Sequence, residues 1–269
     1  MSIPKKIHYC WFGNNPLPDK VKMCIESWRR YCPDYEIICW NEKNYDVYKI
    51  DYIREAYKAG KWAFVSDYAR LDIIFTHGGI YLDTDVELLK SLDGLLGNKM
   101  FLAIEKGNCH IATGLGFGAE KENLWLGELM KIYQKLSFIL KDGSYNLTPC
   151  PQYTTQFFLN EGFCVEDRTQ EINDVLILSS EYFCPMDYHT GIIHITAHTY
   201  GIHWYEASWQ GTSDRKIHWT EIKIMQCMPN KLGILMCAVY RNVYRFLEYT
   251  KEGILLEKIK RKLKKIGGS

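Results

Sequence analysis

Apolar residues recur along the chain in two patterns. Short apolar runs of strand length occupy residues 7–12, 35–40, 80–82, 100–105, 175–178 and 192–197. Longer segments with helical spacing occupy residues 19–31, 50–59, 62–76 and 123–140. In the first of these segments Val21, Ile25 and Trp28 are four and three residues apart, so they share one face of a helix. Strands that alternate with helices predict an α/β fold built on a layered sheet.

The chain after about residue 145 is less regular. It becomes helical again from about residue 222 and then turns strongly basic. Seven Lys or Arg residues lie between Lys251 and Lys265. We therefore predict a folded domain over residues 1–220 and a helical basic tail over residues 221–269.

Composition narrows the class of protein. The 269-residue chain is 47% hydrophobic and 24% charged, which is usual for a globular protein, and its formal net charge of +1 argues against a nucleic-acid partner. Its ten cysteines include no C-x-x-C pair, and its first residues lack the apolar core of a signal peptide. No run of about 18 apolar residues suggests a membrane span. These features predict a cytoplasmic protein with reduced cysteines.

The stretch SDYARLDIIFTHGGIYLDTDVELL, residues 66–89, places charged residues in an otherwise apolar run. Asp83 and Asp85 follow the strand predicted at residues 80–82, at the strand end where α/β sheets bind ligands. Residues two apart on an extended segment face the same way, so these carboxylates repel each other unless a cation lies between them. Oxygen ligands suit Mg²⁺ or Mn²⁺, which also bind phosphate oxygens. The pattern favours a metal and diphosphate site.

A D-x-D pair occurs in three further settings, and each fits this chain less well. A solvated acidic turn is the commonest of them, but apolar residues flank this pair on both sides. An EF-hand loop starting at Asp83 needs Gly at its sixth position and Glu at its twelfth, where this chain has Leu88 and Gly94. A phosphohydrolase of the haloacid-dehalogenase type stays open as an alternative, although it favours Thr or Val where this chain has Glu87.

Asp67 and Arg70 lie three residues apart on the helix predicted at residues 62–76, so they share a face. They either form a simple ion pair or both reach the metal site. A short helical stretch and a glycine turn separate Arg70 from the strand that precedes Asp83, which makes the second arrangement feasible.

Three motifs together resemble a known family. IHYCWFG, SDYARLDIIFTHGGIYLDTDVE and IHWYEASW, spread over about residues 3–209, are similar to the DXD-sugar glycosyltransferases. These include bacterial capsular-polysaccharide transferases and the catalytic domains of clostridial glucosylating toxins. The resemblance implies a GT-A fold: a Rossmann-like mixed sheet flanked by helices, here with a C-terminal helical appendage. It also implies metal-dependent transfer of a hexose, with retention, from a nucleotide sugar (UDP favoured over GDP) to a saccharide acceptor in capsule or other surface polysaccharide synthesis.

The resemblance further implies roles for individual residues. Those assigned to the donor are Trp11 on the base, Tyr81 and Asp83 on the ribose, Asp67 and Arg70 on the sugar, and Ser208 and Trp209 over the diphosphate. Asp85 is expected to ligate Mn²⁺ or Mg²⁺ directly and Asp83 through bound water. His203 is a further candidate ligand, with His198 as its substitute. No residue stands out as the nucleophile of a retaining reaction.

Two further expectations concern binding. A nucleotide-sugar binding module without turnover is a second alternative, because aromatic residues alone would suffice for it. In the basic tail the apolar positions Leu256, Ile259, Leu263 and Ile266 step by three, four and three, so one helical face is apolar. Such a helix either docks on its own domain or lies on an anionic membrane. Because acceptors in the resembled family are often lipid-linked, we predict a peripheral contact with the inner face of the cell membrane.

Overall fold

The computed structural model describes residues 2–206, 212–228, 231–251 and 253. Packing divides the chain into two compact units. Unit 1 comprises residues 1–187 and 193–209, and unit 2 comprises residues 188–192 and 210–269. The domains expected at residues 1–220 and 221–269 remain a prediction.

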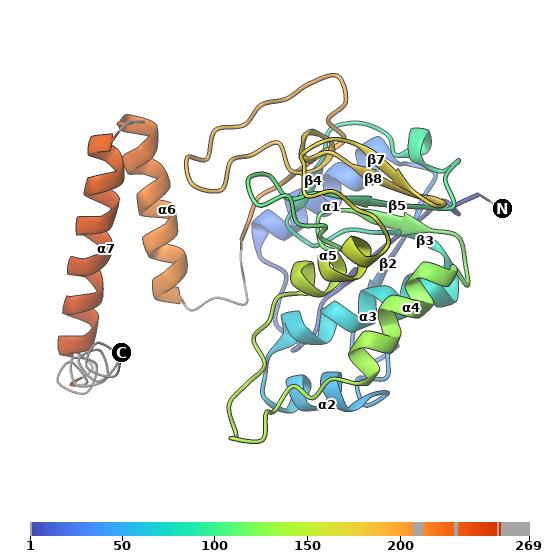
Figure 1. Ribbon diagram of the computed structural model, residues 1–269, viewed down its shortest axis with the longest axis horizontal. Helices are drawn as coiled ribbons and strands as arrows, with labels where there is room; N and C mark the ends of the chain where they lie inside the picture. The colour runs from blue at the N-terminus through green and yellow to red at the C-terminus, as the bar shows by residue number, and fades with distance from the viewer. Residues whose placement is uncertain (1, 207–211, 229–230, 252, 254–269) are drawn as a thin grey trace. The chain divides into compact units, whose positions relative to one another are not determined.

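Unit 1 alternates strands and helices along the chain (Figure 1). Its strands are β1 (Lys6–Cys10), β2 (Glu36–Trp40), β3 (Gly79–Tyr81), β4 (Val86–Leu88), β5 (Met100–Ala103), β6 (Phe117–Ala119), β7 (Gln170–Ile172), β8 (Val175–Leu178) and β9 (Gly201–His203). Its helices are α1 (Asp19–Tyr31), α2 (Asp51–Lys58), α3 (Trp62–His77), α4 (Leu124–Gln134) and α5 (Cys150–Asn160), with short 3-10 turns η1 (Asp93–Leu95) and η2 (Ser180–Tyr182).

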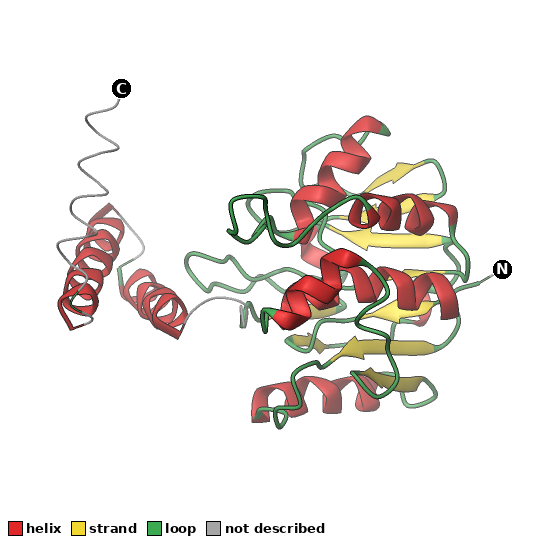
Figure 2. Cartoon of the chain, turned by 90° about the horizontal axis from the view of Figure 1, so that it is seen from below, coloured by secondary structure: helices red, strands yellow, loops and turns green. Residues whose placement is uncertain are grey.

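Seven of these strands form one mixed sheet in the order β2-β1-β3-β6-β5-β8-β7 (Figure 2). β1 pairs in parallel with β2 on one side and β3 on the other, and β6 is antiparallel to both β3 and β5. The winding of the chain therefore reverses at β1, which is the point where open α/β sheets bind ligands. β4 and β9 form a separate antiparallel pair. The expected α/β architecture, a mixed sheet flanked by helices, is confirmed.

Apolar side chains pack on both faces of the large sheet, because successive strand residues point in opposite directions. Ile80 belongs to the layer that includes the buried residues of α1, whereas Tyr81 belongs to the layer that includes those of α2, α3 and α4. Figure 1 shows α2, α3 and α4 grouped together along the sheet. A charged group near the end of β3 therefore has apolar packing on both sides.

The turn between α3 and β3 depends on two glycines. Gly78 and Gly79 have φ angles of 63° and 113°, a region that other residues rarely adopt, and the Gly78 amide donates to Ile74 O over 2.8 Å. A Cβ at Gly79 would lie only 2.8 Å from His8 Nε2. The predicted glycine end of this helix is thus confirmed, and it brings the chain straight back into β3.

The structure corrects four element predictions. The helix expected at residues 123–140 stops at Gln134, because the buried Phe138 leaves the helix and the Phe138 and Ile139 amides donate to Glu55 Oε2. The strand expected at residues 192–197 is reduced to one bridge between Ile193 and Met186. α5, β4, β6, β7 and β9 were not predicted, and the C-terminal helical part begins ten residues earlier than expected, at Thr212 rather than at about residue 222.

Unit 2 consists of two helices that pack against each other, α6 (Thr212–Cys227) and α7 (Lys231–Lys251), with the loop of residues 188–192. The apolar positions Leu256, Ile259, Leu263 and Ile266 of the basic tail lie outside the described residues. Among the helices that the structure describes, none is long and apolar enough to cross a membrane.

Candidate active site

Five of the predicted site residues meet beyond the end of β3. Asp67 and Arg70 come from α3, Asp83 and Asp85 from the loop between β3 and β4, and His203 from the last position of β9. The register of β4 on β9 sets Val86 opposite His203, which carries the histidine to the acidic loop. The site therefore draws on three segments that are far apart in the sequence.

Arg70 is the buried counter-charge of this site. Its side chain is 5% exposed, and its Nη2 lies 3.3 Å from Asp67 Oδ1 and 3.3 Å from Asp83 Oδ1. Its Nε donates to Ser66 O over 3.0 Å, which fixes the plane of the guanidinium. One cation thus offsets two carboxylates. Arg70 forms the ion pair with Asp67 on its own helix and also contacts Asp83 in the loop after β3.

Asp83 is held on several sides. Tyr81 donates its hydroxyl to Asp83 Oδ1 over 3.1 Å, and the Tyr81 ring lies 5.0 Å from the Arg70 guanidinium. The Asp83 amide donates to Gly114 O over 3.1 Å. A Cβ at Gly114 would overlap Asp83 Oδ2, so only glycine leaves room for the carboxylate in this position.

Asp85 has a different set of partners. His203 Nε2 lies 3.4 Å from Asp85 Oδ1, and the Glu206 amide donates to Asp85 Oδ2 over 2.9 Å. The Trp204 amide donates to the Asp85 backbone carbonyl over 3.0 Å. The segment that follows β9 therefore grips Asp85 through both its side chain and its backbone.

These surroundings shift the pKa values of the three carboxyl groups in different directions. Burial raises the pKa of Asp67 to about 6 and also raises that of Asp83, in each case against the opposing charge of Arg70. Burial acts to raise the pKa of Asp85 as well, but His203 and the Glu206 amide outweigh it, and the net shift is downward. The charge of Asp85 in turn raises the pKa of His203 against the effect of burial.

Asp83, Asp85 and His203 form a group that fits a divalent ion. One ligand atom from each residue can be chosen so that all three lie within 4.8 Å of one another. His203 Nδ1 is buried and has no hydrogen-bond partner among the described residues. Two carboxylates and an imidazole are donors that Mn²⁺ and Mg²⁺ accept. His198, the substitute ligand, is exposed and lies beside Tyr182, outside this group.

Other predicted residues are placed as follows. Trp11 directly follows β1, is half-buried, packs against the buried cluster on the α1 side of the sheet, and donates its Nε1 to Asn15 O over 2.6 Å. Tyr81 is 1% exposed and contacts the site through its hydroxyl, which bonds Asp83, and through its ring, which faces Arg70. Ser208 and Trp209 lie outside the described residues. The segment just before them is tethered: Lys20 pairs with Glu206 over 2.8 Å, and Trp204 Nε1 donates to Glu87 Oε2 over 3.0 Å.

Two residues that sequence reasoning missed complete the surroundings of Arg70. Arg70 Nη1 donates to Cys150 Sγ over 3.8 Å, and Thr113 Oγ1 donates to the same sulfur over 3.7 Å. Burial raises the pKa of Cys150 well above the usual thiol range, so the sulfur is a neutral packing partner. Neither residue belongs to a motif that would have revealed it.

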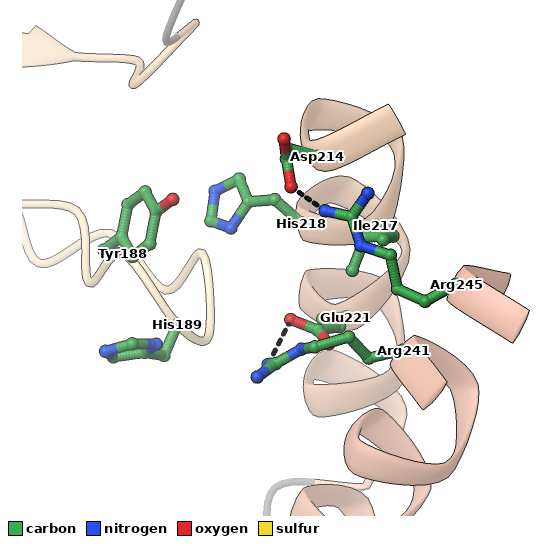
Figure 3. A pocket seen from close by; sticks show the side chains of 8 residues that line it. All are labelled: Tyr188, His189, Asp214, Ile217, His218, Glu221, Arg241 and Arg245. Atoms are coloured by element: carbon green, nitrogen blue, oxygen red, sulfur yellow. Dashed lines mark hydrogen bonds and ion pairs between the residues drawn. The ribbon is translucent and has the colours of Figure 1, made fainter. Parts of the chain in front are cut away.

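Two cavities are lined by residues other than those of this site. A groove of about 570 Å³ runs along α1 beside Tyr9 and Arg29. A second cavity, of about 220 Å³ and wholly in unit 2, lies between α6, α7 and the loop carrying Tyr188 and His189 (Figure 3). None of the residues lining either cavity belongs to the acidic site.

Comparison with known proteins shows a local similarity to one family. Residues 18–102 match the family described as the glycosyltransferase sugar-binding region containing a DXD motif, which confirms the resemblance inferred from the sequence. This part of the chain is therefore similar to the sugar-binding region of DXD glycosyltransferases.

Particular relatives share part of the chain. Inositol phosphoceramide mannosyltransferases 1 and 3 of Schizosaccharomyces pombe are 29% and 33% identical over 111 and 107 residues, which are 37% and 35% of this chain. The matches span 33% and 28% of those two proteins, so the chain spans about a third of the length of these curated relatives. Among solved structures, the PaToxG glycosyltransferase aligns with a TM-score of 0.45 at 17% identity, covering 60% of this chain and 70% of that one.

Proposed function

We propose that this protein is a metal-dependent glycosyltransferase that moves a hexose, with retention, from a nucleotide sugar to a saccharide acceptor. The observation that carries the proposal is the group Asp83, Asp85 and His203 beside the buried Arg70. Three potential ligands of a divalent ion next to a fixed guanidinium suit a diphosphate, because both positive centres attract phosphate oxygens. The match of residues 18–102 to a sugar-binding region supports a sugar as the transferred group.

The chemistry follows from the leaving group. Cleavage of the glycosidic bond leaves negative charge on the nucleoside diphosphate, and a bound divalent ion would help to stabilise that charge. Arg70 offers a planar fork of donors whose direction is set by its bonds to Ser66 and Asp67. Because Arg70 is already held in place, it loses little conformational freedom when the donor binds.

Different residues of the site would then contact different parts of the donor. Asp85, Asp83 and His203 hold the metal, with Asp83 also reaching the ribose beside Tyr81. Asp67 and Arg70 bind the sugar, and half-buried Trp11 offers a face to the base. The family resemblance assigns Ser208 and Trp209 to the diphosphate. UDP is the proposed nucleotide, and no side chain is assigned as a nucleophile.

The acceptor is proposed to be a lipid-linked saccharide in the synthesis of capsule or another surface polysaccharide. The two yeast relatives are named for mannosyl transfer to inositol phosphoceramide, which is a lipid. The basic segment between Lys251 and Lys265 supports a peripheral contact with the cytoplasmic face of the cell membrane, where such acceptors are held.

A screen of nucleotide sugars tests this function. The full chain is incubated with each sugar nucleotide and Mn²⁺, with and without EDTA, and both nucleoside diphosphate and inorganic phosphate are measured. The proposal expects diphosphate release from one donor, stimulated by saccharide acceptors and stopped by EDTA. Release of inorganic phosphate would instead indicate a phosphohydrolase, and tight binding of a nucleotide sugar without release would indicate a binding module.

A further inference from the structure

Helix α7 exposes a continuous line of apolar side chains. Six of them, with exposed fractions between 52% and 60%, are Leu232, Leu235, Val239, Val243, Phe246 and Leu247. At 3.6 residues per turn these six positions fall within about a third of the helix circumference. We call them the apolar stripe. Exposed apolar side chains are ordinary when scattered, but a contiguous patch of this kind marks an interaction surface.

A different face of α7 packs against α6. Gly233 and Cys237 are buried, and Cys237 Sγ donates to Glu221 O over 3.6 Å. Arg241 makes two bonds to the Glu221 carboxylate, and Arg245 pairs with Asp214, as Figure 3 shows from the side of the cavity. The polar and small residues of α7 are thus turned to α6. The stripe lies outside that contact.

The charges around the stripe favour a negatively charged partner. Within α7 the single acidic residue is Glu248, and it is paired with Arg245 over 2.8 Å. The next part of the chain, from Lys251 to Lys265, contains seven Lys or Arg and only two Glu. An apolar helix face followed in the sequence by many basic residues suits an anionic membrane, because apolar side chains can enter the interface while Lys and Arg attract the negative headgroups.

We propose that the apolar stripe of α7 docks on an anionic lipid surface, with the helix lying in the plane of the interface. The stripe runs about 22 Å along the helix, long enough for several side chains to enter the headgroup region together. A second copy of α7 could also cover the stripe, but it would give no role to the basic residues that follow α7 in the sequence, whereas an anionic lipid surface would attract them. The inference rests on the proposed lipid-linked acceptor, because docking would hold the enzyme where that acceptor lies.

Sedimentation with vesicles tests the proposal on the full chain. Vesicles are made of phosphatidylcholine alone or of phosphatidylcholine with phosphatidylserine. The double variant Val239→Gln/Phe246→Gln removes two members of the stripe. Ile234→Gln is its matched control, because Ile234 is 61% exposed on the same helix but lies off the stripe. A version without residues 251–269 measures the share of binding due to the cationic segment.

The expected result is binding of the wild type to phosphatidylserine vesicles only. The double variant should show a partition coefficient lower by at least about tenfold, while Ile234→Gln binds like the wild type. Equal binding by the double variant and the wild type would overturn the proposal. So would a wild-type dimer that the double variant converts to monomer without any vesicle binding, or a loss of thermal stability in the double variant, which would mean that the stripe packs within this chain.

The readouts separate this inference from the proposed function. The stripe lies outside the acidic site, so nucleoside diphosphate release in solution should be the same for the wild type, the double variant and Ile234→Gln. Vesicle binding that depends on the stripe would stand even if no sugar nucleotide were turned over. Transfer without vesicle binding would uphold the enzyme and reject the docking surface.

Discussion

The acidic site of unit 1 and helix α7 of unit 2 depart from the usual distribution of side chains in opposite directions. Unit 1 buries ionisable groups: the whole residues Asp67 and Arg70 are 7% and 4% exposed. Unit 2 leaves hydrocarbon in water, with Leu235 and Phe246 more than half exposed. Both arrangements carry a cost, since buried charges lose hydration and exposed apolar groups forgo burial.

The two regions differ in where the compensation comes from. In unit 1 most of it is internal, because Arg70 lies between two carboxylates and His203 lies beside Asp85. The pair of Asp83 and Asp85 is nevertheless incompletely matched in charge, and a divalent ion would complete it. For α7 the described residues provide no such cover, and a lipid surface is the partner proposed above to supply it. A buried charge therefore points to a ligand of the site, and an exposed stripe to a partner surface.

The largest effect is expected when Asp85 is replaced. Asp85→Ala should lower nucleoside diphosphate release by at least about a hundredfold, because it removes a direct metal ligand. Asp174→Asn is the control, since Asp174 is exposed and pairs only with Lys99. Near-normal turnover by Asp85→Ala, or full activity of the wild type in EDTA, would show that the acidic pair is not a metal site.

The internal compensation can be broken at Arg70. Arg70→Met leaves two buried carboxylates without their cation, so we expect the free energy of unfolding to fall by about 3–5 kcal/mol. Arg54→Met removes an exposed pair with Asp51 and should cost less than about 1 kcal/mol. Urea unfolding of both variants measures the difference. If both variants lose a similar free energy of unfolding, burial does not increase the contribution of Arg70 to stability.

A third test concerns His8, a titratable residue of unit 1 that is buried in its neutral form. His8 is fully buried, and burial lowers its pKa from 6.5 to about 4, although the bond from Nε2 to Gly78 O acts to raise it. Nδ1 accepts from Trp40 Nε1. As the pH falls below 6.5 the unfolded chain takes up this proton before the folded one does. The stabilisation is therefore complete above pH 6.5 and is lost as the pH falls through 4, up to about 3 kcal/mol.

The measurement compares the wild type with His8→Gln, whose amide can still accept from Trp40 and donate to Gly78 but does not titrate. Urea unfolding at pH 7 and pH 4.5 should show a smaller acid-induced loss for His8→Gln. His77, beside His8, titrates in both proteins and cancels in the difference. Parallel pH curves for the two proteins would rule out His8 as the titrating group.

The smallest expected effect is at the edge of the site. Trp11→Ala should weaken binding of the nucleoside diphosphate by about 1–3 kcal/mol, which is the range for stacking of a base on an aromatic ring. Isothermal titration measures it, with Trp125→Ala on α4, whose ring packs against Phe157 and Phe158, as the control. Unchanged affinity in Trp11→Ala would leave its ring without a role in base binding.

Local patterns in the sequence determined much of the scaffold. The periodicity of Val21, Ile25 and Trp28 predicted α1, and Gly78 and Gly79 marked the end of α3. The position of Asp83 and Asp85 after a short apolar run predicted a ligand site at a strand end. These features depend on neighbours within a turn or two of the chain, so spacing and residue type are enough to reveal them.

Only the tertiary structure decided which distant residues complete each region. Pairing of β4 with β9 brings His203 rather than His198 to Asp85, and the start of α5 sets Cys150 against Arg70. The same apolar spacing that buries Trp28 in α1 leaves Phe246 exposed in α7. Periodicity shows that a helix has an apolar face, but whether that face is covered depends on which surfaces meet, and contacts between remote segments are not encoded in local spacing.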